Sequence, residues 1–213
     1  MGIRDRLLAG TARQLGHPDG WRGQLVGRML NRANRTFVLA AVEAAGVAPG
    51  SAAADLGFGG GVGLRLLLDS VGPSGRVYGV DVSRTMLERA RVRFADEWAA
   101  GRLELTAGSL VDLPLGEDSV DAVITVNTFY FLEDPRPALR EIARVLRPGG
   151  RVVIGIGDPD EMARIPVTAH GFHLRPAQEI VEAMTSVGLR DAHDQPLALG
   201  KRRAHLLLGS APD

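Results

Sequence analysis

The chain has 213 residues, which is enough for one sizeable hydrophobic core and too few for two ordinary domains. Its 25 basic and 25 acidic residues cancel, which argues against a protein that coats nucleic acid. The lack of cysteine excludes disulfides, thiolate nucleophiles and cysteine-ligated metals, and without a signal peptide or a long apolar run we expect a cytoplasmic protein.

The first predicted element is a helix over residues 21–45, WRGQLVGRMLNRANRTFVLAAVEAA. Leu25, Met29, Ala33 and Phe37 recur every fourth residue and give the segment one apolar stripe. The turn residues Pro49 and Gly50 then end it, so we expect an N-terminal helical extension over residues 1–48.

From residue 52 onward, short apolar segments alternate with helical ones. Strands are predicted at 52–56, 76–80, 103–106, 121–126, 151–156, 189–193 and 204–208. Helices are predicted from the glycines near 60 to about 71, over 85–99 behind the cap Ser83, from Asp134-Pro135 to Pro148, and after Pro176. This alternation predicts an α/β fold with an open, doubly wound, mostly parallel sheet, which binds ligands beyond the carboxyl ends of its strands.

A glycine-rich stretch, AADLGFGGGVG, follows the first predicted strand at such an end. Bare backbone amides at a helix N-terminus favour an anionic or polar ligand. A phosphate-binding P-loop is excluded because it needs a lysine, and the single lysine is Lys201. A dinucleotide-binding GxGxxG fails because Val62 occupies the third glycine position. The pattern that fits is an acid followed by GxGxG, formed by Asp55, Gly57, Gly59 and Gly61.

This stretch resembles motif I of the class I S-adenosylmethionine (SAM)-dependent methyltransferases, and four further segments follow in that family's order. VDVS at 80–83 resembles the segment with the ribose-binding acid, and GSLVDLP at 108–114 resembles the adenine loop. DSVDAVITVN at 118–127 resembles the fourth strand, and LRPGG at 146–150 resembles the turn before the fifth strand. Ser109 departs from the pattern, because the family usually has an aspartate there, and a neutral hydroxyl accepts more weakly than a carboxylate.

The resemblance implies a seven-stranded Rossmann-like methyltransferase fold with SAM as cofactor and S-adenosylhomocysteine (SAH) as product. We expect a single domain, with an N-terminal cap at 1–48, a cofactor-binding core at 49–156 and an acceptor-side loop with the last strands at 157–213. The residues expected at the cofactor are Asp55, Gly57, Phe58, Gly59, Gly61, Asp81, Val82, Met86, Ser109, Leu110 and Asn127.

Several of these residues also have a plain structural interpretation. The glycines could form only a tight strand-to-helix turn, Phe58 and Met86 could belong to the core, and Asn127 could be a turn residue. Asp81 does not choose the cofactor by itself, because an NAD-binding protein would place an acid at the same distance from its glycines. The glycine spacing makes that choice.

The implied reaction is an in-line displacement at the methyl group of a sulfonium, for which the protein mainly positions the reactants and excludes water. A general base is needed only for a poorly acidic nucleophile, so catalytic residues stay unassigned, with Tyr130, His170 and His173 as candidates. An aromatic after the fourth strand is also a common core residue, and loop histidines are commonly surface residues. The spacing of histidines and carboxylates along the sequence does not predict a metal site.

The leading hypothesis is therefore a methyltransferase acting on a small-molecule acceptor, as a monomer or homodimer without nucleic-acid partners. Three alternatives stay open: an RNA or protein methyltransferase on the same fold, an NAD(P)-dependent oxidoreductase, and a SAM-binding protein without catalysis.

Overall fold

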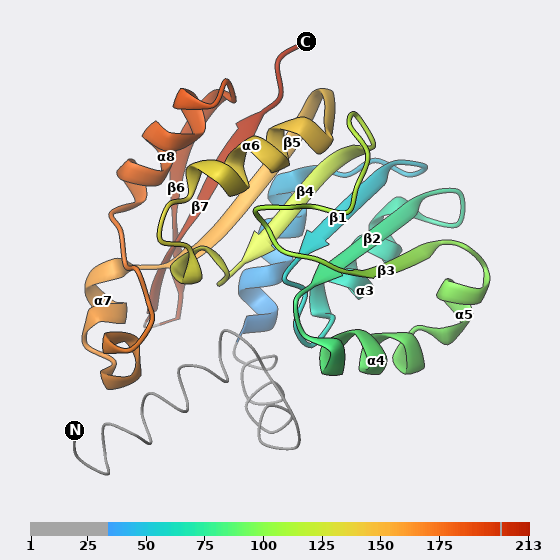
Figure 1. Cartoon of the computed structure of the whole chain (residues 1–213), viewed down its shortest axis with the longest axis horizontal. Coiled ribbons are helices and arrows are strands. Elements are labelled where there is room, and N and C mark those ends of the chain that lie inside the picture. The colour runs from blue at the N-terminus through green and yellow to red at the C-terminus, as the bar shows by residue number, and fades with distance from the viewer. Residues whose placement is uncertain (1–33, 201) are drawn as a thin grey trace.

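The computed structural model describes residues 34–200 and 202–213 (Figure 1). Residues 34–45 are helical. The strands are β1 (Ala52–Leu56), β2 (Arg76–Asp81), β3 (Leu103–Ala107), β4 (Val120–Val126), β5 (Leu146–Gly157), β6 (Arg190–Leu199) and β7 (Arg202–Ser210). The helices are α3 (Val62–Val71), α4 (Arg84–Arg93), α5 (Ala95–Ala99), α6 (Arg136–Val145), α7 (Pro159–Ala163) and α8 (Ala177–Ser186), with the 3-10 turns η1 (Phe129–Phe131) and η2 (Pro166–Ala169).

The strands form one seven-stranded sheet in the order β3-β2-β1-β4-β5-β7-β6. Neighbours from β3 to β5 run parallel, whereas β7 is antiparallel to both β5 and β6. The winding direction reverses between β1 and β4, so the carboxyl ends of β2, β1, β4 and β5 meet at the switch point of the sheet. The predicted doubly wound, mostly parallel α/β fold is confirmed.

The sheet separates two hydrophobic cores because successive strand residues point to opposite faces. Val123 of β4 belongs to one core, with α6 and α8, and the next residue, Ile124, belongs to the other, with α3, α4 and the helical residues 34–45. Figure 1 shows α6 and α8 on one face and residues 34–45 on the other. Both faces are therefore covered, as a parallel sheet requires.

The structure differs from the prediction at element ends. The helix expected over 85–99 breaks at Phe94, whose side chain is fully buried and separates α4 from α5. β5 starts at Leu146, so the Pro-Gly-Gly turn lies within it at a register irregularity opposite β4. The loop expected after β5 contains α7 and η2. Of the helix predicted at 21–45, the part before residue 34 lies outside the described residues.

Candidate cofactor site

The glycine loop turns sharply at the end of β1. Gly57, Gly59 and Gly61 have φ angles of 71°, 51° and 73°, a left-handed conformation that glycine adopts without steric cost. The amide of Gly57 donates a hydrogen bond to the Val80 carbonyl at 2.7 Å. A Cβ atom at Gly57 would lie 2.4 Å from Cγ2 of Thr128. At Gly57 the loop is thus pressed between the ends of β2 and β4, where a side chain would not fit.

Asp81 ties this loop to the end of β2. Its Oδ2 accepts a hydrogen bond from the Gly59 amide at 2.9 Å, and its Oδ1 accepts one from the Ser83 amide at 2.9 Å. The Ser83 hydroxyl in turn caps α4 by accepting from the Met86 amide. An ionised carboxylate has about four lone-pair sites, so it can accept from several donors at once, ligand hydroxyls among them.

Asp55 lies buried at the end of β1 and faces the first turn of α3. A Cβ atom at Gly63 would lie 2.2 Å from its Oδ2, so only glycine fits there. Burial, and secondarily the charge of Asp81, raise the pKa of Asp55 to about 8, while a hydrogen bond from the backbone of Leu64 acts in the opposite direction. Asp55 therefore keeps its proton near neutral pH, and a nearby cation would favour its release.

The residues expected around an adenine base divide into exposed and buried ones. Val82 is 41% exposed at the end of β2. The half-buried Ser109 pairs through its backbone with Asp112, and its hydroxyl separately accepts from the Val111 amide. Leu110 is half-buried against the core. Phe58 and Met86 are buried in the core on the α3 side. Val82, Ser109 and Leu110 are thus the three with accessible surface in this group.

Asn127 and Tyr130 lie together where β4 ends. Asn127 has a φ of 61°, an uncommon conformation for a side-chain-bearing residue, and its amide donates to the Gly155 carbonyl of β5. The Tyr130 hydroxyl donates to Oδ1 of Asn127 at 3.2 Å and accepts from the Gly157 amide. Burial raises the pKa of Tyr130 above its ordinary value. The hydroxyl therefore joins β4 to β5, and its phenolate form is disfavoured.

The two candidate histidines lie in the segment that follows β5. His170 is half-buried just after η2, and its amide donates to the Val167 carbonyl. His173 is exposed, and its amide donates to the Tyr130 carbonyl at 2.7 Å. The backbone of His173 is thus fixed beside the end of β4. A catalytic role for either imidazole, or for Tyr130, stays a prediction.

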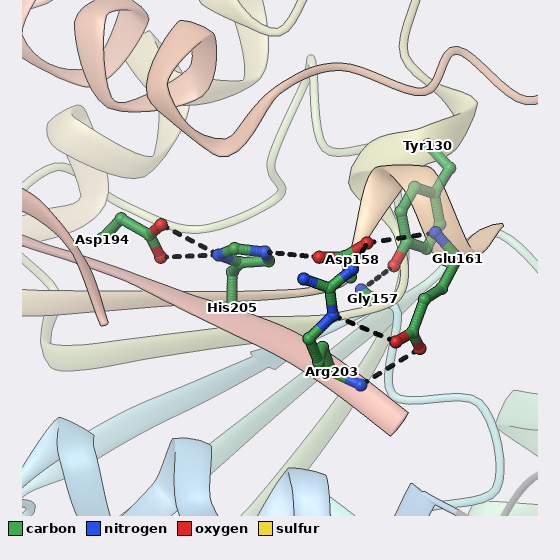
Figure 2. A network of polar contacts seen from close by, with 7 residues as sticks. All are labelled: Tyr130, Gly157, Asp158, Glu161, Asp194, Arg203 and His205. Atoms are coloured by element: carbon green, nitrogen blue, oxygen red, sulfur yellow. Dashed lines mark hydrogen bonds and ion pairs between the residues drawn. The ribbon is translucent and has the colours of Figure 1, made fainter. Parts of the chain in front are cut away.

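Two groups of polar residues at the carboxyl ends of the strands were not predicted from the sequence. Thr125 donates to the Leu56 carbonyl and hydrogen-bonds the hydroxyl of Thr128, which supports the glycine loop from β4. Asp158, Arg203 and His205 form a network beyond β5 (Figure 2). An Asp-Pro pair can start a helix, so Asp158-Pro159 is a local signal that could have pointed to the first member of that network. Its partners lie about 45 residues away and carry no local signal.

The glycine loop, Asp55 and Asp81 together form a cradle whose chemistry fits SAM. Three left-handed glycines leave the loop at the switch point without Cβ atoms, and Asp81 presents carboxylate oxygens beside them. Asp55 supplies a buried acid that a cationic group would ionise. The sequence-predicted residues from β1, β2 and β4 therefore converge on one place.

Comparison with known proteins agrees with this geometry. Residues 54–154 match the family described as a methyltransferase domain. The chain is 37% identical over 110 residues to an arsenite methyltransferase from Halobacterium salinarum, a match covering 52% of this chain and 28% of that protein. It is 42% identical over 87 residues to a demethylmenaquinone methyltransferase from Lactococcus lactis, covering 41% and 34%.

A solved structure extends the likeness to almost the whole chain. It is described as a complex between the Haloferax volcanii Trm112 methyltransferase activator and the putative methyltransferase, and the matched chain is 25% identical with a TM-score of 0.78. The match covers 91% of this chain and 96% of that one. The first curated relatives are matched over only about a third of their own length.

Proposed function

Residues 54–154 form a class I SAM-dependent methyltransferase domain, and we propose that the chain transfers the SAM methyl group to a small-molecule acceptor. The match to this SAM-dependent family confirms the resemblance seen in Asp55, Gly57, Gly59 and Gly61. The observation that supports the proposed activity best is the cradle itself, in which Asp81 holds the Gly59 amide at 2.9 Å.

Each residue of the cradle has a role in this proposal. SAM supplies a methyl group already activated by its sulfonium. The backbone of Gly57, Gly59 and Gly61 would let the cofactor approach closely, and Asp81 would accept from its ribose hydroxyls. Asp55 would ionise toward the cofactor's amino group. Asn127, at the switch point, would border the side from which the acceptor enters.

The proposed acceptor is a small molecule rather than RNA or protein. The formal net charge of zero offers no excess of basic residues for a polyanion. The relatives are named for acceptors as different as arsenite and demethylmenaquinone, so their names do not select one. Salt-sensitive binding of RNA would favour the alternative of an RNA methyltransferase.

The first experiment is calorimetric titration of the full chain with SAM, SAH and, as control, NADH. We expect micromolar binding of SAM and SAH and no heat from NADH. Binding of NADH alone would overturn the proposal and favour an oxidoreductase. Turnover of SAM to SAH with a panel of small acceptors then separates an enzyme from a protein that only binds SAM.

The proposal also includes a cytoplasmic monomer or homodimer. In the described part of the chain, no helix is both long and apolar enough to cross a membrane. The Haloferax volcanii neighbour was solved with an activator protein, so light scattering of the purified chain, alone and with added Trm112, would test whether a partner is needed.

A further inference from the structure

A chain of charged groups crosses the end of the sheet from β6 to α7 (Figure 2). The Nδ1 atom of His205 lies 2.8 Å and 3.0 Å from the two carboxylate oxygens of Asp194. Its Nε2 faces Oδ2 of Asp158 at 3.6 Å. Arg203 continues the chain, because its guanidinium contacts Asp158 at 3.3 Å and Glu161 at 3.1 Å. His205 thus has one carboxylate at each ring nitrogen.

These contacts are made where the segment of residues 158–174 leaves β5. Asp158 caps α7 by accepting from the Glu161 amide, and its own amide donates to the Arg203 carbonyl at 3.0 Å. Glu161 also accepts from the Arg203 amide at 3.1 Å. Under the proposed function this stretch borders the acceptor, and we name residues 158–174 the acceptor-side segment.

The other end of the acceptor-side segment is fixed by different contacts. The His173 amide donates to the Tyr130 carbonyl, and the ring of Phe172 lies 4.9 Å from that of Phe131. Arg175 donates to the carbonyl of Glu133. The segment is therefore held to β7 at its first end and to η1 at its second.

The acceptor-side segment has almost no apolar core of its own. Its two buried residues, Asp158 and Thr168, are both polar, and the Thr168 hydroxyl bonds the carbonyls of Met162 and Ile165 within the segment. Met162, Phe172 and Leu174 are only partly buried against the sheet. With so little apolar burial, the polar contacts at the ends must decide how firmly the segment is held.

We propose that His205 is a positioning residue that fastens the acceptor-side segment to the sheet, and that protonation of its imidazole tightens this hold. The protonated ring donates from Nδ1 to Asp194 and presents positive charge to Asp158 from Nε2. In the neutral ring, Nδ1 keeps its proton for Asp194, so Nε2 turns a lone pair toward the Asp158 carboxylate. The attraction to α7 is then lost. This proposal depends on the proposed function in one respect, namely that an acceptor binds beside the segment.

Three neighbours of His205 favour their charged forms: Asp158, Glu161 and Arg203. Burial acts to raise the pKa of Asp158, but the hydrogen bond from the Glu161 amide and the charge of Arg203 hold it below its ordinary value. Hydrogen bonds from Arg203 lower the pKa of Glu161, and the pKa of Arg203 is raised mainly by Glu161. Within the described residues, no group of three or more His, Asp or Glu side chains is placed to hold a metal ion. Histidine is the side chain that ordinarily changes its charge between about pH 5 and 8, so the proposal is tested at pH values within that range.

Hydrogen–deuterium exchange of the full chain at pH 6 and pH 8 tests the proposal, with rates corrected for intrinsic exchange. We expect peptides from residues 159–174 to be about two- to fivefold better protected at pH 6, the effect of one partly exposed ion pair. His205→Gln should abolish this difference, and a peptide from β1 should show no effect of the substitution. The matched control is His193→Gln, on exposed β6, which should behave like wild type.

A pH difference that persists in His205→Gln would overturn the proposal, because His170 and His173 remain in that variant and would then be its source. Asp194→Asn serves as a second variant if His205→Gln does not fold. It should reduce the difference in protection between pH 6 and pH 8, because it weakens the contact between Asp194 and Nδ1 of His205. SAH titration of the wild-type samples separates the two proposals. Intact SAH binding without a pH difference refutes the role of His205 alone, whereas absent SAH binding with an intact difference refutes the proposed function alone.

Discussion

At the scale of single residues, the two aspartates that end β1 and β2 have different tasks. Asp81 holds backbone amides of two segments, the glycine loop and the start of α4. Asp55 is enclosed by the first turn of α3, and burial favours its protonated form. One acid therefore organises the loop from outside, while the other holds a proton beneath it.

Replacing Asp81 with asparagine should weaken SAH binding by roughly 10- to 100-fold, the effect of losing charged hydrogen bonds to hydroxyl donors. The asparagine side chain keeps one acceptor oxygen for one of the two backbone amides that Asp81 holds, so we expect the fold to persist. Calorimetric Kd values and circular dichroism measure the two effects. The control is Asp69→Asn on α3, whose side chain is 63% exposed. An unchanged Kd in Asp81→Asn would remove Asp81 from the cofactor site.

Asp55→Asn should change how stability depends on pH. In wild type the pKa of Asp55 rises from 3.8 unfolded to about 8 folded. Between these values only the folded state holds the proton, so the free energy of unfolding falls as pH rises from about 4 to 8. Asparagine does not titrate. Its stability relative to wild type should therefore be greater at pH 8 than at pH 5, by at least about 1.4 kcal/mol.

Denaturant unfolding of both proteins at the two pH values measures this difference. Any constant effect of the amide on packing cancels between pH 5 and pH 8, so only the titration remains. Parallel stability curves for Asp55→Asn and wild type would show that Asp55 ionises normally in the folded chain.

At the scale of elements, the glycine loop shows why a pattern of small residues identifies a site. Gly57 is constrained twice, by its φ of 71° and by Thr128. Gly101, after α5, has a φ of 67°, but no described atom lies within 4 Å of the position that a Cβ atom would take there. The two glycines therefore separate the cost of the backbone conformation from the cost of crowding.

Gly57→Ala should destabilise the chain more than Gly101→Ala. Both substitutions place an L side chain in the left-handed region, at a cost of roughly 1 kcal/mol. Only Gly57→Ala also pushes a methyl group into Thr128, which should add about 1 to 3 kcal/mol. Chemical denaturation compares the two, and SAH titration should show loss of binding for Gly57→Ala alone. Equal destabilisation would mean that Thr128 moves aside freely.

The elements that the sequence predicted well are those with local signals. β1 was predicted at its observed bounds because the mostly apolar segment 52–56 ends at a glycine loop, and α8 starts after Pro176 as expected. The cofactor cradle was found because the spacing of Asp55, Gly57, Gly59 and Gly61 reflects backbone requirements. These features depend on neighbours in the chain.

Features that depend on distant partners could not be predicted. The break at Phe94 follows from packing under the glycine loop, where a Cβ atom at Gly61 would lie 3.0 Å from the ring. The Tyr130 hydroxyl pairs with Gly157, and His205 pairs with Asp158 and Asp194 only because β5, β6 and β7 are neighbours. A sequence pattern does not specify which side chains meet across antiparallel strands near the end of the chain.

At the scale of the whole molecule, the sheet divides the site between its two faces. The glycine loop continues into α3, which packs in one core, and Tyr130 belongs to the other core, with α6 and α8. Damage to one core should therefore reach the cofactor cradle and damage to the other should not, even where the loss of stability is the same.

Leu67→Ala on α3 and Leu139→Ala on α6 test this division, because both leucines are fully buried. Each substitution should lower the free energy of unfolding by about 2 to 5 kcal/mol, through lost burial and a residual cavity. We expect Leu139→Ala to keep the SAH Kd within about twofold of wild type, as distant sites behave additively. Leu67→Ala should weaken binding further, because α3 can then shift beneath Gly61 and Asp55. Equal effects on Kd would mean that the sheet transmits strain between its faces rather than separating them.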